Sequence, residues 1–313
     1  MAIWMLLAIA AQFLNAGVSL VDKYIVTNPK VLPQPFVYAF YTCVLAGAAI
    51  VVYGFSAVPV PLDGVSFPSL YNVRFPTLEV MALAMFAAYT FFYALVSLFK
   101  ALQEADASDV VPVVGAVSAV GSYALASLFL GTQLSSSFLL GVLLLALGTA
   151  LVSRFHFSWT VALSSLHAGI FFALHFVVMK GLFNMTSFDN GFFWSRAGLV
   201  LFALSLLLIP SYGGRIFAQT KVTGKRASVL ILINKAIAGF ASILVLKATE
   251  LGDVSVVQAL GGLQYVFIFA FGAVLGPHTP IAYGENTRNP KVLLRKALFI
   301  GVITLGFFIL FRG

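Results

Sequence analysis

The segment Lys100–Leu128, KALQEADASDVVPVVGAVSAVGSYALASL, returns without a gap as Lys247–Leu275, KATELGDVSVVQALGGLQYVFIFAFGAVL. Both copies open with Lys-Ala, continue with Asp-x-Ser and carry a glycine at the same later position. Repetition over such a length indicates internal duplication. If each copy belongs to a half with an odd number of membrane spans, the two halves lie upside down relative to each other, as in many secondary transporters. The repeat therefore predicts a membrane protein with two inverted halves that moves a solute.

The composition is that of a chain whose main solvent is lipid. Hydrophobic residues make up 61% of the sequence and charged residues only 9%, well outside the range of soluble globular domains. No long polar or charge-rich segment indicates an appended catalytic or nucleic-acid-binding module. The formal charge of +8 is expected to set the orientation of the chain in the membrane, because the basic residues cluster in short loops beside apolar segments. The single cysteine, Cys43, excludes an intramolecular disulfide and a cysteine-based metal cluster.

The apolar segments predict the membrane topology. Taking runs of about 18 or more mostly apolar residues as spans, the chain has ten: 2–21, 36–55, 78–99, 109–130, 136–153, 160–182, 191–211, 227–248, 254–276 and 294–311. The fold class is therefore all-α and integral membrane, with ten transmembrane helices as two inverted five-helix repeats. The boundary falls after the fifth span, which gives halves of 1–155 and 156–313.

The loop charges predict the orientation. Most Lys and Arg residues outside the spans follow odd-numbered spans, which favours odd loops in the cytoplasm and both termini outside. No basic residue precedes the first span, and its apolar stretch exceeds a typical signal core, so we expect this span to stay on the protein.

Helix-junction motifs resemble those of a known family. KALQEADASDVVPV is similar to the junction between the third and fourth helices of EamA-type members of the drug/metabolite transporter superfamily, and KATELGDVSVVQALGGLQYVF to the junction between their eighth and ninth. Trp4 and Trp159 open the two halves, as aromatic residues often do in that family. The resemblance implies alternating access, with a central cavity lined by spans 1, 3, 4, 6, 8 and 9, and both termini in the cytoplasm. That last implication conflicts with the charge count.

Two departures from the family pattern narrow the function. Gly131-Thr132-Gln133 and Gly276-Pro277-His278 stand where many members carry a glutamate after the fourth and ninth helices. The small multidrug-resistance relatives exchange protons through a glutamate inside their first helix, whereas the first span here has no acid before Asp22, at its end. A proton-driven drug antiporter of that type is disfavoured.

Polar residues at helical spacing mark the faces expected to meet a solute, because polar side chains facing lipid are costly. Four such faces fall in two equivalent pairs of spans, 1 with 6 and 4 with 9. They comprise Gln12, Asn15, Ser19 and Asp22; Ser164, His167, Phe171 and His175; Ser108, Val111, Gly115, Ser118 and Ser122; and Ser255, Gln258, Gly262 and Tyr265. The alternative is hydrogen bonding between helices, worth about 0.6 kcal/mol per contact in a membrane.

Lys235 is the sharpest single candidate because it lies deep inside span 8, where a lysine costs roughly 2.5–3.5 kcal/mol. One reading is that it binds an anionic or carbonyl-bearing solute. The other is structural, either snorkelling to the interface or pairing with Asp22 or Glu79. Arg196 lies close enough to the end of span 7 for snorkelling.

The acidic residues at the repeated junctions, Glu104, Asp106, Glu250 and Asp253, are expected to cap the helices that follow, with ion coupling as an alternative role. The candidate substrate-binding residues are Gln12, Asn15, Tyr89, His167, His175, Asn234, Lys235, Gln258 and Tyr265.

The sequence predicts a secondary transporter of a small polar metabolite, an amino acid or similar solute, and not an enzyme. Nucleotide-sugar or sugar-phosphate transport within the same superfamily is the alternative, followed by a multi-span membrane enzyme and a non-transporting membrane subunit. No P-loop, GxSxG or HExxH motif is present, and no cofactor or metal is expected. The expected partners are the solute and the lipid of the plasma (inner) membrane, with a coupling ion left open and no nucleic acid. A monomer or a homodimer is expected.

Overall fold

The structure of the chain, a computed structural model, describes residues 2–59, 66–133, 139–141, 143–144 and 158–275. Every regular element in these ranges is a helix, so the all-α class is confirmed. Seven helices are long and apolar enough to cross a membrane, or eight if one bent pair counts as a single span. The predicted fifth and tenth spans, 136–153 and 294–311, lie almost wholly outside the described residues.

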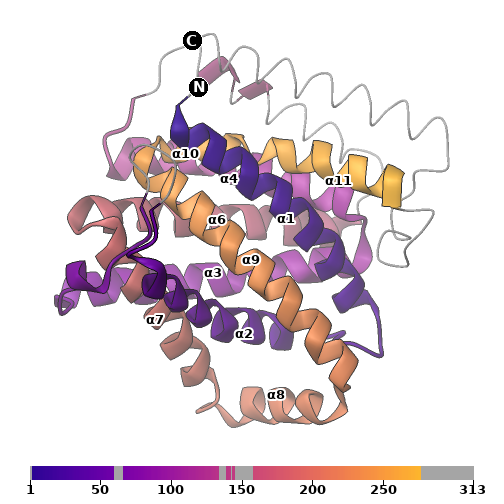
Figure 1. The fold of residues 1–313 in the computed structure, drawn as a ribbon. Coiled ribbons are helices and arrows are strands. Elements are labelled where there is room, and N and C mark those ends of the chain that lie inside the picture. Colours follow the sequence, from indigo (N-terminus) through magenta and orange to yellow (C-terminus); the bar gives the residue numbers. More distant parts are fainter. Residues whose placement is uncertain (1, 60–65, 134–138, 142, 145–157, 276–313) are drawn as a thin grey trace.

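The elements follow the predicted spans closely, but several helices run further (Figure 1). Their order is α1 (Ile3–Thr27), α2 (Pro35–Ala46), η1 (Gly47–Phe55), η2 (Leu70–Asn72), α3 (Leu78–Glu104), α4 (Ala107–Phe129), α6 (Trp159–Met185), α7 (Phe188–Leu206), α8 (Pro210–Val222), α9 (Lys225–Leu251), α10 (Val254–Ala259) and α11 (Gly262–Leu275).

Side-chain caps start several of the long helices, because the first backbone N–H groups of a helix have no partner within it. Thr77 accepts from Val80 at the start of α3, and Ser158 accepts from Val161 at the start of α6. The expected cap at Asp253 is confirmed, since its carboxylate accepts from two backbone N–H groups of α10.

Asp106 departs from the expected capping role. It occupies the N-cap position of α4 but makes no side-chain capping bond. Its carboxylate lies 3.2 Å from Nζ of Lys23 instead. An ion pair with another helix has therefore taken the place of the local cap.

Two lysines fasten the two repeated junctions in the same way. Lys23, near the end of α1, donates to the carbonyl of Ala105 between α3 and α4 at 2.6 Å. Lys180, near the end of α6, donates to the carbonyls of Glu250 and Gly252 between α9 and α10, at 2.7 and 2.9 Å. Lys23 lies beyond the predicted end of span 1, on a helix that continues to Thr27, and Lys180 lies near the end of the predicted span 6. Each lysine supplies donors to carbonyls that a helix end leaves without a helical partner.

The long helices pack as a bundle with related contacts. α1 packs along α9 and α11, and α6 packs along α3 and α4, while α4 also meets α10 and α11 (Figure 1). Buried apolar side chains form two main clusters. One contains Leu7, Ala11 and Phe192, towards the beginnings of α1 and α7, and the other contains Ile25 and Leu206, towards their ends. The middle of the bundle lies between these clusters.

The predicted seventh span, 191–211, is not one straight helix. α7 ends at Leu206, and the chain turns by 99° into α8. Pro210 is the first residue of α8, a position at which the missing N–H of proline costs nothing. Figure 1 shows α8 running across the bundle between the end of α7 and the start of α9.

Close helix contact predicts how two glycines respond to substitution. A Cβ atom on Gly169 of α6 would lie 2.5 Å from Cβ of Val117 and 2.9 Å from the carbonyl oxygen of Val114, both on α4. We expect Gly169→Ala to lower the free energy of unfolding by about 1–3 kcal/mol through overpacking. Gly239→Ala in α9 is the matched control, since its Cβ would meet nothing within 4 Å. Thermal unfolding of both variants in detergent checks this, and equal stability of the two would contradict it.

Candidate functional site

A cavity of about 200 Å³ lies in the middle of the bundle. Its wall comes from α1, α3, α4, α6, α9 and the α10–α11 segment, together with Thr42 of α2. The lining residues fall near the centre of each long helix, for example Asn15 in α1, Phe172 in α6 and Ala238 in α9. A water-filled or solute-filled space at this level is where membrane transporters place their binding sites.

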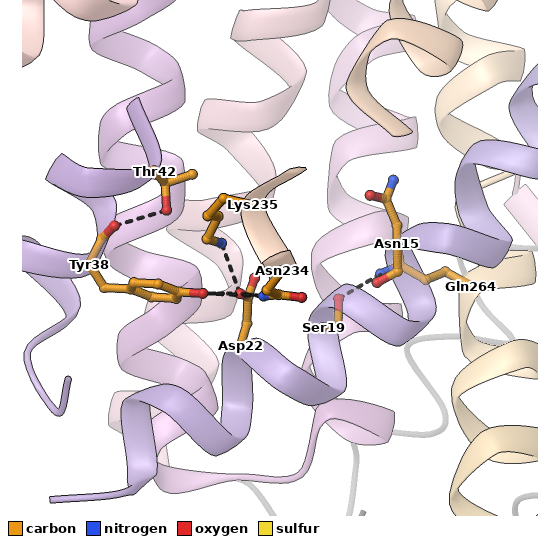
Figure 2. Close-up of polar contacts among 8 residues, drawn as sticks. All are labelled: Asn15, Ser19, Asp22, Tyr38, Thr42, Asn234, Lys235 and Gln264. Atoms are coloured by element: carbon orange, nitrogen blue, oxygen red, sulfur yellow. Dashed lines mark hydrogen bonds and ion pairs between the residues drawn. The ribbon is translucent and has the colours of Figure 1, made fainter. Parts of the chain in front are cut away.

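Asp22 anchors the polar side of this cavity through a buried ion pair (Figure 2). Its Oδ1 accepts from Nζ of Lys235 at 2.8 Å, from Nδ2 of Asn234 at 2.6 Å and from the hydroxyl of Tyr38. Lys235 also lies over the ring of Tyr38, with Nζ 4.3 Å from its centroid, and over Phe99 at 5.2 Å. The two charged side chains are only 4% and 8% exposed. Three donors on one carboxylate oxygen and two aromatic faces around the ammonium offset the cost of burying both charges.

Of the two readings of Lys235, the pairing with Asp22 is confirmed. The same lysine also lines the cavity, so pairing and a role near a solute are compatible. Tyr38 was missed by the sequence reasoning. The available signal in the sequence was that Tyr38 lies one helical turn before Thr42 in span 2. In the structure the Thr42 hydroxyl donates to the Tyr38 carbonyl.

The predicted polar face of span 1 meets the cavity as a set. Its four residues, Gln12, Asn15, Ser19 and Asp22, all belong to the lining. Gln264 of α11 holds this face by donating to the Asn15 carbonyl at 3.0 Å and to Oγ of Ser19 at 2.8 Å (Figure 2).

The predicted face of span 9 is displaced by one residue after Gln258. We expected Gly262 and Tyr265 on this face, whereas Gly261 and Gln264 line the cavity with Gln258. The reason is a tight turn between α10 and α11, in which the backbone N–H groups of Gly261, Leu263 and Gln264 each donate to the carbonyl three residues earlier. Side chains three apart eclipse each other in such a turn, so the face follows steps of three.

Gln258 is held by only one end of its amide. Its Oε1 accepts from the hydroxyl of Ser118 on α4 at 3.2 Å. Its Nε2 is buried and has no partner among the described residues, although the side chain is 8% exposed and lines the cavity. An unpaired buried donor is costly, so this amide favours an acceptor that occupies the cavity.

The two histidines of span 6 have different surroundings. His175 is buried, lines the cavity and places Nδ1 2.9 Å from the Ala87 carbonyl on α3. A carbonyl can only accept, so Nδ1 carries the hydrogen and a neutral ring keeps Nε2 as an acceptor. His167 is exposed and hydrogen-bonds Ser97 of α3 at 2.6 Å, outside the cavity lining.

Four of the nine candidates, Tyr89, His167, Asn234 and Tyr265, therefore do not line the cavity. His167 makes the contact between helices that was the alternative reading of the polar faces. Tyr89 is 40% exposed and belongs to an aromatic cluster with Tyr93 and Phe202. Tyr265 is fully buried in the apolar core because of the turn before α11. Asn234 lies behind the wall, bound to Asp22, and the remaining five are lining residues: Gln12, Asn15, His175, Lys235 and Gln258.

The expected snorkelling of Arg196 is wrong. The side chain is 2% exposed, and the guanidinium donates to Oγ of Ser242 at 3.2 Å and to Oγ of Ser195 at 3.4 Å. It also lies over the ring of Phe192, 5.0 Å from the centroid. The Arg196 side chain of α7 points into the bundle towards α9. The position of a residue along its span does not predict which way its side chain points.

A second hollow, of about 430 Å³, lies between α2–η1 and α9. Its lining is apolar except for Lys235, and Phe55, Leu232 and Phe240 in it are exposed. Because its lining is almost wholly apolar, this hollow is not assigned to a polar solute. Within the described ranges, no group of three or more His, Cys, Asp or Glu residues could hold a metal ion.

Comparisons with known proteins bear on the fold and leave the family open. No family model matches the chain, and no curated protein matches it. A solved crystal structure, described simply as that of a protein, has a TM-score of 0.63 to this chain at 18% sequence identity. The match covers 99% of each chain. At this identity the similarity shows a shared fold over nearly the whole length and carries no function.

The surroundings of the ion pair predict an asymmetric response to its removal. Asp22→Asn leaves a buried ammonium without its counter-ion, and we expect a loss of about 3–5 kcal/mol in the free energy of unfolding. Lys235→Met is expected to cost less, because Asn234 and Tyr38 still donate to Asp22. Denaturation of both single variants and the double variant in detergent gives the coupling energy. Additive effects of the two substitutions would contradict a direct pair.

Proposed function

We propose that the chain is a secondary transporter that moves a small polar metabolite, an amino acid or similar solute, by alternating access. In this proposal it has the EamA-type arrangement of the drug/metabolite transporter superfamily, with ten spans in two inverted halves, 1–155 and 156–313, in the plasma (inner) membrane. The observation that carries the proposal is the cavity. It is lined by α1, α3, α4, α6, α9 and α10–α11, which correspond to spans 1, 3, 4, 6, 8 and 9, the set that the family resemblance implies.

Paired features on the two sides of the bundle support the inverted repeat. Lys23 and Lys180 fasten equivalent junctions, and α1 contacts α9 and α11 as α6 contacts α3 and α4. The turn between α10 and α11 also supports transport, because discontinuous helices commonly border the solute site of transporters.

The size of the cavity favours the small metabolite over a nucleotide sugar. A volume of about 200 Å³ is below the roughly 300–1,000 Å³ typical of pockets for drug-sized ligands. A solute of amino-acid size fits this space, whereas a nucleotide sugar is too large for it.

Transport by purified protein in liposomes tests the proposal. We expect counterflow uptake of at least one solute from a panel of amino acids and small organic acids, and Gln258→Leu should reduce it about tenfold by removing an amide that faces the cavity. Gln219→Leu in α8 is the matched control, because Gln219 is also 8% exposed but lies outside the cavity lining. Folded protein that moves no member of the panel would count against transport.

Labelling at α8 tests the membrane orientation. With Cys43, the single cysteine, replaced by alanine, Arg215→Cys places a thiol at an exposed position of α8. The loop charges predict that this thiol is cytoplasmic, protected from a membrane-impermeant maleimide in intact cells and labelled after lysis. Labelling in intact cells would instead fit the orientation that the family resemblance implies.

A further inference from the structure

Arg196 is a buried cation that forms no ion pair with a carboxylate among the described residues. The described residues form three ion pairs, Lys23–Asp106, Lys235–Asp22 and Lys247–Glu250, and Arg196 is in none of them. Asp189, on the same helix, is committed elsewhere, since it accepts from the backbone of Ser69 and from the side chain of Asn72.

The groups around Arg196 do not neutralise it. Cys43 and Tyr53 are within electrostatic range, but a thiol and a phenol ordinarily carry no charge at neutral pH. The two serine hydroxyls and the Phe192 ring satisfy only some of the five guanidinium donors. A buried charge without a counter-ion is strongly unfavourable, so the described part of the site lacks one negative charge.

The charge balance of the cavity also indicates that Arg196 needs a negative partner. Lys235 is already matched by Asp22 at 2.8 Å, so this pair contributes no net charge. Arg196 therefore supplies the excess positive charge near the cavity. An acidic solute gains more from Arg196 than from Lys235, because it need not displace a protein carboxylate first.

Ser242 connects Arg196 to the cavity. Its Oγ accepts from the guanidinium at 3.2 Å, and the residue is part of the cavity lining. Because Oγ accepts from a cation, its own hydrogen is polarised and free to donate into the cavity. The buried Nε2 of Gln258, which lines the same cavity without a partner among the described residues, is a second donor.

We infer that the Ser242 hydroxyl binds the carboxylate of the transported solute, with the charge of Arg196 behind it, and that Gln258 donates from Nε2 to an oxygen of the same molecule. The assignment rests on the proposed transport function for its setting, since it takes the cavity as the solute site. Ser242 makes the direct contact and Arg196 supplies the charge behind it. The solute class is thus a small organic acid whose carboxylate is its main recognition element.

The test compares carboxylates with the matching carboxamides, which lack the negative charge of the carboxylate. L-Lactate and L-lactamide form one pair of probes and L-alanine and L-alaninamide the other, measured by thermal shift in detergent and by counterflow in liposomes. We expect at least one carboxylate to stabilise the wild-type protein and its amide to fail at equal concentration. Arg196→Gln should weaken the carboxylate response by about tenfold or more, because it removes the positive charge that polarises the Ser242 hydroxyl.

Two further variants separate binding from folding. Ser242→Ala removes the hydroxyl while keeping the buried guanidinium, and it should also weaken the carboxylate response. Arg215→Gln removes an exposed arginine of α8 and should leave the response unchanged. If Arg196→Gln fails to fold, the comparison of Ser242→Ala with wild type decides.

The outcomes distinguish this inference from the transport proposal. Equal responses to acid and amide, no response to any carboxylate, or a carboxylate preference that survives both Arg196→Gln and Ser242→Ala would overturn the inference. If the liposomes still take up a solute in those cases, transport stands. Carboxylate binding that depends on Ser242 without any counterflow would support the inference and overturn transport.

Discussion

A cation inside an apolar bundle must find oxygen atoms, a carboxylate or an aromatic face, and much of this structure is organised by how four basic side chains do so. Lys23 and Lys180 use the carbonyls at two helix junctions. Lys235 uses a carboxylate, that of Asp22. Arg196 has hydroxyls and a ring but no carboxylate within the described residues. Asp22 neutralises Lys235, whereas the guanidinium of Arg196 is fully buried with neutral partners among the described residues.

The contacts of the three lysines hold the helices that surround the cavity. The two junction lysines connect α1 to the α3–α4 corner and α6 to the α9–α10 corner. The ion pair at Asp22 connects α1 to α9, and the hydroxyl of Tyr38 adds α2. These contacts connect the helices around the cavity, while Gln258 in the cavity wall and Arg196 behind Ser242 keep donors that these contacts do not use. A protein that must bind and release a solute requires such unsatisfied groups, because fully paired polar groups gain little from a ligand.

Most of the helical architecture could be predicted from the sequence, and about half of the candidate site. The apolar runs predicted the helices well, since helix is the simplest way to satisfy backbone groups in lipid. The polar face of α1 was predicted as a set because that helix is regular from Gln12 to Asp22. The prediction of the polar face of span 9 was wrong after Gln258, because backbone hydrogen bonds from residue i+3 to residue i near Gly261 changed the helical periodicity. Tyr89 and His167 were misplaced because helical spacing shows which residues share a face but not which neighbour that face meets.

The sequence alone determined the lipid solvent, the helical class, the positions of most spans and the repeated junctions, because these depend on composition and local periodicity. Only the tertiary structure decided that Lys235 is neutralised by Asp22, 213 residues away, and that Arg196 is buried without a carboxylate among the described residues. Pairing depends on how α1, α7 and α9 are rotated against one another. That rotation is set by packing across the whole bundle, so it cannot be predicted from the sequence of any single helix.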